Sequence, residues 1–362
     1  MKRFYTNRDL IGDRYGRMFH LPRVLVERGW EVQVFCPDFH TREAFSREVE
    51  GIVFQSLPAR LAGAWTKGRA WKDFEPDIWL ASGQLIAARQ ARQVARTQGV
   101  PWAVDFYDYY PAFFPKWARS WADAWSHRLM ASASGVIVAS RSLGDWAARS
   151  NSNVLRLPNG IDQSLFHPRP KFEALKALGL DPRKAWVGYF GSLNPEHGLR
   201  ETVEAIASLR SRGLDVGLVC AGRSNRLDLI EGVGAKWLGM LPQEKLAEAI
   251  CACDCALAPY PDSDQIHFSN SCRLTEYVAC SVPVVATRVG DHGQLLPENH
   301  PGWANPGDSE SLADAIERQL HQAMLVSPPT SLDWSALGAK LDSFLTEVVK
   351  GRRAARRGSD TA

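Results

Sequence analysis

The sequence predicts an α/β protein made of two facing Rossmann-like domains, each built on a parallel sheet. The chain has 362 residues, which is more than one typical domain and suits two domains of common size. Short apolar segments alternate with longer amphipathic ones, as they do in parallel α/β layers. The segment His167-Pro168-Arg169-Pro170 interrupts this alternation, which then begins again. Two similar halves without close sequence repetition therefore predict two domains.

In the first half, short apolar segments predict six strands. They cover residues 31–36, 52–57, 78–81, 102–105, 135–139 and 154–157. Residues 14–29 carry apolar side chains at helical spacing, and Gly29 ends that predicted helix just before the strand at 31–36. Residues 2–6 are a short, basic candidate for an earlier strand.

The second half repeats the pattern. The predicted strands cover residues 186–190, 216–221, 235–238, 256–258 and 282–286, and the predicted helices cover 200–212, 244–251, 272–280, 309–322 and 336–349. We expect domains at 1–166 and 167–335, a closing helix at 336–350 that packs back toward the first domain, and a disordered basic tail at 351–362. Ligands of such sheets bind outside the carboxyl ends of the strands, so we expect a site in the interdomain cleft.

Composition argues for a cytoplasmic protein. No run approaches the roughly 18 apolar residues that a membrane-spanning helix needs, and residues 1–7 lack the apolar core of a signal peptide. The seven cysteines are odd in number, and Cys251, Cys253 and Cys255 alternate, which suits neither disulfides nor zinc. We expect them to be small buried residues near a strand, and we expect neither a metal nor a cofactor.

Charge is unevenly distributed along the chain. Residues 1–160 hold 22 Lys and Arg against 15 Asp and Glu, hence +7, whereas the remainder holds 21 against 25, hence −4. A basic first half suggests an anionic partner, either a phosphate-bearing acceptor or a lipid surface. No motif for binding nucleic acid accompanies this charge.

The strongest local signal lies at residues 270–287, where polar residues precede a helix starting near Cys272. The first turn of a helix has unpaired N–H groups and the positive end of the dipole, which suit a diphosphate. Arg273 adds a fork of donors for phosphate oxygens, and Glu276, one turn on, can accept hydrogen bonds from ribose hydroxyls. A capped surface helix with both side chains in solvent explains the same pattern equally well.

Residues 275–287 resemble the "EYMA-x-G-x-PVVAT" segment of glycosyltransferase family 4 (group 1) enzymes. Further similar segments follow in the family's order at residues 29–34, 157–162, 188–193, 196–199, 221–222, 238–239, 256–259 and 306–313. The resemblance covers nearly the whole chain. It implies the GT-B fold, with acceptor binding in the first domain and donor binding in the second. It also implies retaining transfer of a sugar from a nucleotide-sugar to a hydroxyl, with the nucleotide-sugar as substrate and no metal.

The resemblance assigns the donor site residue by residue. Glu276 matches the second glutamate of the family's E-x7-E pair, which holds the ribose. Leu274 and Thr275 are expected to offer backbone N–H groups to the phosphates, Gly191 to lie beneath the diphosphate, and Trp237 to lie near the base. Arg223 is a further donor-site candidate, and Arg273 is expected to stabilise the departing diphosphate.

This chain departs from the family pattern at three positions. Phe268 stands where the first glutamate of the pair is expected, and Ser192 and His197 replace the usual phosphate-binding Arg and Lys. Arg273 is expected to compensate for the lost charges, and Asp264 or His267 for the lost sugar contacts. A site that has lost its activity remains an alternative explanation.

Acceptor residues are predicted in the first half. The glycine-bearing loop 12–17 resembles the family's acceptor loop, with candidates Gly12, Asp13, Arg14 and Arg17. Its two arginines can pair with a phosphate, although a plain surface loop would look similar. Residues 104–111 follow a strand, so Asp105 and Asp108 are candidate catalytic carboxylates, with Tyr109 beside them. Helix capping by Asp108 is the alternative.

Two segments, 65–72 and 113–125, mix aromatic with basic residues. Such segments can lie in a membrane interface. However, Trp117, Trp121 and Trp125 follow a four-residue spacing that also suits a packed helix, and core packing is the prediction that we favour. Peripheral contact with the inner face of an anionic membrane is the alternative.

The resemblance thus implies a glycosyltransferase that acts in bacterial-type cell-surface glycan or glycolipid assembly. A sugar-nucleotide epimerase of the same fold and an inactive binding scaffold are the alternatives. An NAD-dependent enzyme is disfavoured because no G-x-G-x-x-G motif follows an early strand.

Overall fold

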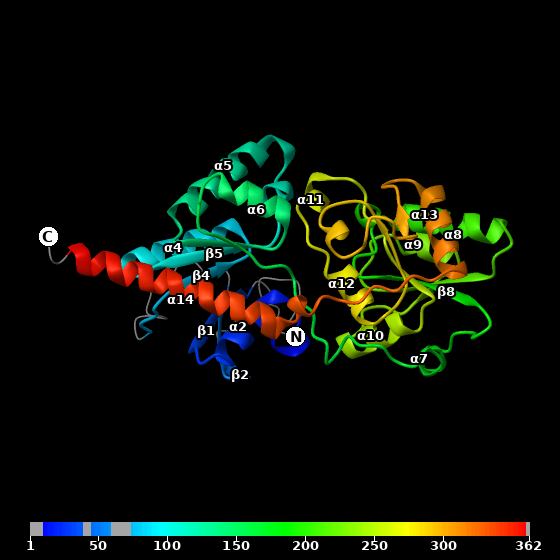
Figure 1. The fold of residues 1–362 in the computed structure, drawn as a ribbon, viewed down its shortest axis with the longest axis horizontal. Helices are drawn as coiled ribbons and strands as arrows, with labels where there is room; N and C mark the ends of the chain where they lie inside the picture. The colour runs from blue at the N-terminus through cyan, green and yellow to red at the C-terminus, as the bar shows by residue number, and fades with distance from the viewer. Residues whose placement is uncertain (1–9, 39–44, 59–73, 360–362) are drawn as a thin grey trace. The chain divides into compact units, whose positions relative to one another are not determined.

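The computed structural model describes residues 10–38, 45–58 and 74–359 and divides the chain into two compact units (Figure 1). The first unit comprises Met1–Asn159 together with Trp334–Ala362, and the second comprises Gly160–Asp333. The divisions therefore fall at 159/160 and 333/334, where the sequence suggested 166/167 and 335/336. Helix α14 (Trp334–Ser359) belongs to the first unit although it ends the chain.

The first unit contains two sheets. Strands β4 (Trp79–Ser82), β5 (Trp102–Phe106), β6 (Gly135–Val138) and β7 (Val154–Arg156) form a parallel sheet in that order. Strands β1 (Val32–Asp38) and β3 (Ile52–Pro58) pair in parallel, and β2 (Phe45–Val49) joins β3 antiparallel. These positions confirm the six predicted strands of this half. The candidate strand at residues 2–6 lies outside the described residues.

Strand β2 was not predicted from the sequence. It is joined to β3 by a tight turn in which Glu50 and Gly51 have φ of 52° and 76°. Two successive residues with positive φ define the type I′ turn that joins hairpin strands. Since β2 is mostly exposed, it lacks the apolar run that marks the buried strands.

A cavity of about 580 Å³ lies within the first unit, between β1 and β4. Mainly apolar side chains from both strands line it, including Val34, Phe35 and Leu80. Arg17 of helix α2 (Arg17–Val26) and Asp105 of β5 also reach its wall. The carboxyl end of β5 therefore borders enclosed space.

Helix α14 packs on α2. The ring of Trp334 stacks on His20 at 4.9 Å, and Trp30 donates a hydrogen bond from Nε1 to Asp342 at 2.8 Å. A methyl group on Gly338 would lie 2.7 Å from Val24, so the two helices approach closely. The predicted disordered tail is wrong as far as Ser359, because the helix continues through residues 351–359. Arg and Ala, which dominate that stretch, are good helix formers.

The described part of the first unit has four further helices. They are α1 (Leu10–Asp13), α4 (Leu85–Gln98), α5 (Arg119–Ser132) and α6 (Arg141–Ala148), with short 3₁₀ segments η3 (Tyr110–Phe113) and η4 (Lys116–Ala118). The prediction that Trp117 and Trp121 pack into the core is wrong, because both side chains are exposed. The second aromatic and basic segment, 65–72, lies outside the described residues.

The second unit has one parallel sheet of order β10-β9-β8-β11-β12-β13. Its strands are β8 (Ala185–Phe190), β9 (Val216–Ala221), β10 (Lys236–Trp237), β11 (Cys255–Ala258), β12 (Val284–Thr287) and β13 (Trp303–Ala304). Only the two-residue β13 was not predicted. Its helices are α7 (Lys171–Leu178), α8 (Leu199–Ser211), α9 (Leu227–Gly232), α10 (Gln243–Cys251), α11 (Asp264–His267), α12 (Cys272–Ala279) and α13 (Ser309–His321), with 3₁₀ segments η5 (Pro195–His197), η6 (His292–Gln294) and η7 (Thr330–Leu332).

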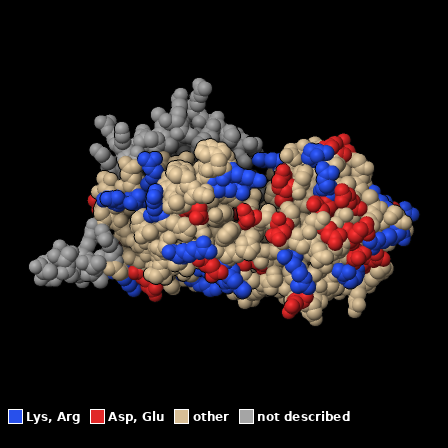
Figure 2. All heavy atoms as spheres, turned by 90° about the horizontal axis from the view of Figure 1, so that it is seen from above, with Lys and Arg blue, Asp and Glu red and all other residues tan. Residues whose placement is uncertain are grey.

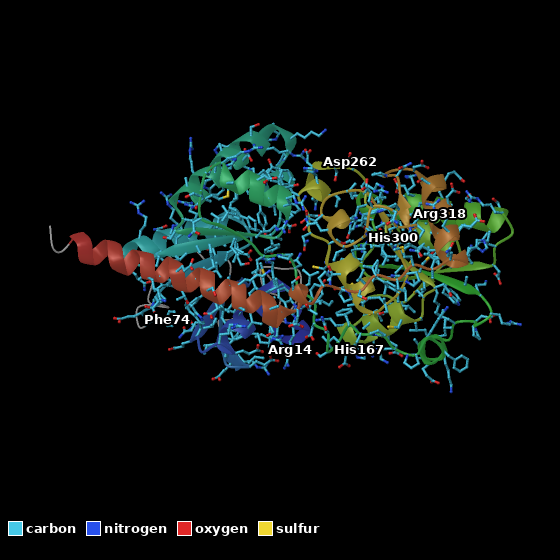
Figure 3. The ribbon with its side chains drawn as sticks, in the orientation of Figure 1. Arg14, Phe74, His167, Asp262, His300 and Arg318 are labelled. Carbon is cyan, nitrogen blue, oxygen red and sulfur yellow. The ribbon has the colours of Figure 1, made fainter. Side chains whose placement is uncertain are left out.

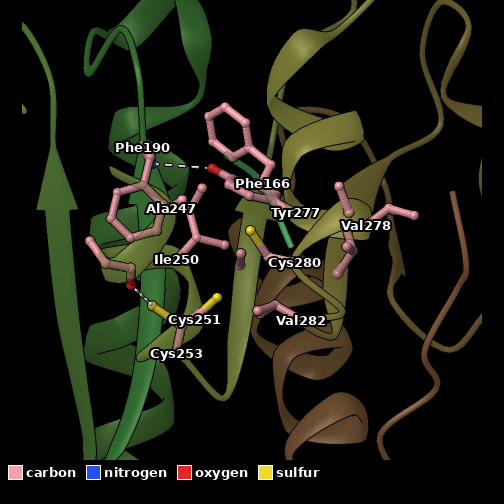
Figure 4. Close-up of a cluster of buried hydrophobic side chains, with 14 of the residues drawn as sticks. Phe166, Phe190, Ala247, Ile250, Cys251, Cys253, Tyr277, Val278, Cys280 and Val282 are labelled. Carbon is pink, nitrogen blue, oxygen red and sulfur yellow. Dashed lines mark hydrogen bonds between the residues drawn. The ribbon is translucent and has the colours of Figure 1, made fainter. Parts of the chain in front are cut away.

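Two apolar cores stabilise the second unit. In one of them, Tyr277 of α12 accepts a hydrogen bond at its hydroxyl from the backbone N–H of Phe190, at 3.2 Å (Figure 4). This bond ties α12 to the end of β8. Cys251, Cys253 and Cys255 are buried free thiols, which confirms their predicted packing role. The other core contains Tyr189, Leu193 and Leu199.

Candidate active site

Arg273 occupies the first turn of α12 and is 7% exposed. Its guanidinium lies over the rings of Tyr189 and Tyr260, each at 4.9 Å, and Nη2 donates a hydrogen bond to the Ser192 carbonyl at 3.2 Å. Nη1 is buried and has no hydrogen-bond partner among the residues that the structure describes. The alternative of an Arg in solvent is therefore wrong. A buried donor without a partner is costly, so this position favours an anionic ligand.

The loop after β8 approaches Arg273 closely. Gly191 has φ of 105°, and a Cβ there would lie 2.8 Å from Arg273 Nη2. Gly222, which follows β9, has φ of 138°, and its Cβ would lie 1.8 Å from the Gly191 carbonyl oxygen. Both positions favour glycine because of their positive φ, and a Cβ would in addition meet the Arg273 guanidinium at Gly191 and the backbone of Gly191 at Gly222. Ser192 and Arg223, the next residues of these two loops, have exposed side chains.

Two imidazoles lie beside Tyr260. The ring of His197 lies 6.0 Å from it and that of His292 lies 5.5 Å from it. Burial lowers the pKa of each histidine to about 4, and the positive charge of Arg273 acts in the same direction. Both rings are therefore neutral near pH 7.

Each imidazole has one nitrogen without a hydrogen-bond partner in the described part of the chain, namely Nδ1 of His197 and Nε2 of His292. His292 Nδ1 donates to the Thr287 carbonyl at 2.9 Å, which makes its Nε2 the acceptor of the neutral ring. Sequence reasoning predicted His197 but missed Tyr189, Tyr260 and His292. No local pattern marks those three, because they come from segments far apart in the chain: strand β8, the residues after β11 and the 3₁₀ segment η6.

The first turn of α12 is capped within the chain. Ser271 accepts a hydrogen bond at Oγ from the backbone N–H of Leu274 at 3.3 Å, and Thr275 donates its hydroxyl to the Ser271 carbonyl at 3.2 Å. A phosphate that used the Leu274 amide would therefore replace the serine cap. Glu276, one turn further, is buried rather than in solvent.

The other predicted donor residues are Trp237, Asp264 and His267. Trp237 of β10 donates from Nε1 to the Gly222 carbonyl at 3.2 Å, which connects the indole to the glycine loops. Asp264 and His267 lie on the one-turn helix α11, and both are exposed. Phe268, at the position of the missing glutamate, directly follows that helix.

In the first unit, Arg17 and Asp105 form a buried bidentate ion pair, with N···O distances of 2.7 and 2.9 Å. Asp105 also accepts a hydrogen bond from the Ser82 hydroxyl at 2.7 Å, and Arg17 Nη1 donates to the Leu157 carbonyl at 3.0 Å. Arg17, predicted to pair with an acceptor phosphate, thus pairs with a carboxylate of its own unit. This arrangement gives both residues a structural role.

Asp108 lies just beyond β5, at the end where active-site residues of parallel sheets gather. Burial raises the pKa of its carboxyl to about 7, with Arg17 lowering it and Asp105 raising it. A carboxyl that titrates near neutral pH can accept or donate a proton. Tyr109, the next residue, donates its hydroxyl to Asp123 at 3.1 Å.

The predicted acceptor loop begins as a helix. Gly12 and Asp13 are the last two residues of α1, and Arg14 follows with φ of 46°. Arg14, labelled in Figure 3, forms an ion pair with Glu50 at 2.6 Å. Of the loop residues whose burial is described, namely Gly12 and residues 14–17, Arg17 alone is buried.

No helix in the described part of the chain combines the length and the apolar character needed to cross a membrane. Within the same residues, no three or more His, Cys, Asp or Glu side chains are grouped so as to hold a metal ion.

Comparison with known proteins identifies the class. Residues 17–160 match the glycosyl transferase 4-like domain, and residues 184–322 match glycosyl transferases group 1. The two matches fall in the two units, and the chain belongs to the group 1 glycosyl transferases.

Among curated relatives, sulfoquinovosyl transferase SQD2 of Arabidopsis thaliana is 25% identical over 324 residues, which cover 83% of this chain and 62% of the relative. The putative teichuronic acid biosynthesis glycosyltransferase TuaC of Bacillus subtilis is 25% identical over 319 residues, which cover 84% of this chain and 79% of the relative. The chain thus spans less than two thirds of the length of the Arabidopsis protein.

Solved structures support the fold. Sucrose-phosphate synthase of Thermosynechococcus elongatus has a TM-score of 0.68 at 17% identity, covering 95% of this chain and 93% of that one. Anabaena HepE in complex with UDP and glucose has a TM-score of 0.60 at 18% identity, covering 86% of each chain. The predicted GT-B fold class is confirmed. The assignments of individual site residues stay predictions.

Proposed function

We propose that this protein transfers a sugar from a nucleotide-sugar to an acceptor hydroxyl, with retention at the anomeric carbon and without a metal ion. The observation that carries the proposal is the buried guanidinium of Arg273, whose Nη1 has no partner among the described residues. Charge-assisted hydrogen bonds to a diphosphate would satisfy this nitrogen. The adjacent first turn of α12 adds the positive end of a helix dipole.

The proposed reaction balances without a further reactant. The bond between the anomeric carbon and the donor phosphate oxygen breaks, and the acceptor oxygen bonds to the same face of that carbon. The acceptor proton passes to the departing phosphate oxygen. Arg273 stabilises the negative charge of the leaving diphosphate. Because the His197 ring is neutral, its buried Nδ1 can donate a hydrogen bond to a phosphate oxygen without adding charge, in the tautomer that carries the proton there. Nε2 of His292 is an acceptor and suits a sugar hydroxyl instead.

Other residues receive supporting roles in this proposal. Glu276 accepts hydrogen bonds from the ribose, and Trp237 lies near the base. Asp108 orients the acceptor hydroxyl from the first unit. UDP is the first nucleotide to test, since the Anabaena neighbour was solved with UDP.

The acceptor that we propose belongs to cell-surface glycan or glycolipid assembly, in line with the name of the Bacillus relative. The net charge of +7 on residues 1–160 supports contact with an anionic membrane, where such an acceptor would be presented.

The test is to replace Arg273 with Ala and with Lys, and to measure nucleoside diphosphate affinity by calorimetry and donor turnover with a panel of nucleotide-sugars. A hydrogen bond to a charged group contributes about 1.5–3 kcal/mol, or about tenfold to a hundredfold in affinity. We expect that loss for Arg273→Ala and a smaller one for Arg273→Lys. The control is Arg183→Ala, which removes an exposed arginine paired with Asp181. Unchanged affinity and turnover in both Arg273 variants would overturn the proposal.

A further inference from the structure

Three large aromatic side chains project from one stretch of the first unit. Phe113 ends η3 and is 56% exposed, Trp117 in η4 is 87% exposed, and Trp121 in α5 is 59% exposed. Soluble proteins rarely keep several large aromatics together in water unless the surface meets a partner. These residues are not part of the site described above.

The exposure follows from how α5 is anchored. Ala122, Ser126 and Leu129 are buried on its inner side, so the opposite side faces solvent. On that side the ring of Trp121 contacts Trp125 at 5.1 Å and Phe114 at 6.2 Å. Phe114, Trp121 and Trp125 therefore form one aromatic cluster, and Phe113 and Trp117 lie next to it in the sequence.

The charges around this row are almost all positive. Helix α4, which packs against α5, carries three arginines and no acidic residue. Residues 113–132 add Lys116, Arg119 and Arg128 against a single acidic residue, Asp123. Asp123 accepts hydrogen bonds from Tyr109 and from Trp146 Nε1, at 3.1 and 2.8 Å, which ties it to neighbouring residues of the unit. Figure 2 looks onto the side of the first unit where α5 lies, and basic side chains there border uncharged surface.

We propose that this α4–α5 surface, defined by Phe113, Lys116, Trp117, Trp121 and Arg128 with Arg89 and Arg96 of α4, docks on an anionic lipid surface. Tryptophan favours the membrane–water interface because its ring is apolar and its N–H is polar. Lysine and arginine beside such rings are attracted to anionic headgroups. A surface with one sign of charge suits a bilayer of uniform charge, whereas a protein partner would need a matching acidic patch.

The proposal places the acceptor-binding unit at the membrane, and to that extent it rests on the proposed function. The expected membrane affinity has two contributions, one from the basic side chains and one from the aromatic rings. Each basic side chain near an anionic bilayer contributes about fivefold in partitioning. The exposed aromatic rings add the burial of their apolar area.

The experiment measures the fraction of the full chain that sediments with phosphatidylcholine vesicles, prepared with and without about 30% phosphatidylglycerol as the anionic lipid. The test variants are Trp117→Gln/Trp121→Gln and Lys116→Gln/Arg128→Gln. Phe172→Gln is the matched control, since Phe172 is an equally exposed aromatic of the second unit, at 63%. Brominated lipids in the same vesicles report whether the tryptophans enter the interface.

We expect binding that needs the anionic lipid and weakens with salt. We expect it to fall at least about tenfold in the tryptophan variant and about twentyfold in the charge variant, with no change for Phe172→Gln. Vesicle binding that survives both double variants would overturn the proposal. Self-association through Trp117 and Trp121, in a protein that does not bind vesicles, would also overturn it. The two proposals can fail separately, because Arg273 is not part of this surface. A protein that binds vesicles but no nucleoside diphosphate would refute the proposed function and leave the membrane proposal standing.

Discussion

The buried ion pair in the first unit gives the sharpest stability prediction, through the substitution Asp105→Asn. Asp105 is 0% exposed and Arg17 is 4% exposed, and two of the Arg17 nitrogens reach the two carboxylate oxygens. The variant keeps the shape of the side chain but leaves the arginine without its counter-ion. Breaking such a pair by removing one partner costs about 3–5 kcal/mol in the free energy of unfolding. For a domain of this size that lowers Tm by about 6–20 °C.

Urea unfolding followed by tryptophan fluorescence measures the effect. Nine of the 13 tryptophans precede residue 150 and Trp334 adds a tenth, so the signal reports mainly on the first unit. Ser82→Ala is the control, because it removes one hydrogen bond to the same carboxylate and should cost only about 1 kcal/mol.

The double variant Arg17→Met/Asp105→Asn should recover much of the loss, since no unpaired charge remains. Nucleoside diphosphate affinity should not change, because the proposed donor site lies in the second unit. If Asp105→Asn unfolds within about 1 kcal/mol of the parent and turnover is lost, the structural interpretation is wrong and Asp105 acts in catalysis.

Two further predictions concern the glycine loops beside Arg273 and the carboxyl of Asp108, whose pKa lies near neutral pH. Gly222→Ala should destabilise by at least about 3 kcal/mol, because its Cβ would lie 1.8 Å from the Gly191 carbonyl oxygen. The control is Gly232→Ala, because no atom lies within 4 Å of the added Cβ, and it should change the free energy of unfolding by less than about 1 kcal/mol. Equal urea midpoints for the two variants would contradict the close approach of Gly222 to Gly191. Burial raises the pKa of Asp108 from 3.8 to about 7. Between these two values the folded state binds more protons than the unfolded state. The free energy of unfolding therefore falls as pH rises from about 4 through about 7. Asp108→Asn should remove that dependence, and identical stability profiles of parent and variant from pH 4 to 8 would show that the carboxyl is not buried as described.

The sheet was largely predictable, because buried parallel strands read as short apolar runs. Strand β2 (Phe45–Val49) was not predicted because its three central residues are exposed and polar, so it gives no such run. The hairpin signal lay instead in Glu50 and Gly51, where only the glycine shows in the sequence as a residue suited to positive φ. β13 is too short, at two residues, to produce a pattern.

The site was predictable only where its residues share a local segment. Arg273 and Glu276 stand one turn apart on a helix, so spacing alone places them together. The pairing of Arg17 with Asp105 spans 88 residues, and no single-sequence pattern encodes it. Helical spacing also showed that Trp117, Trp121 and Trp125 share a face. It did not show that this face is turned away from the core, because periodicity fixes the grouping of side chains and not their environment.

The packing of α14 on α2 has a consequence for biosynthesis. The first unit takes its core from both ends of the chain: Leu21 and Val24 lie in the same cluster as Leu337 and Leu341. The second unit, Gly160–Asp333, is one uninterrupted segment. On the ribosome, the second unit can therefore finish folding while the beginning of the chain still waits for helix α14 to be translated. Until then the apolar side of α2 stays open to solvent and is a natural binding place for a chaperone.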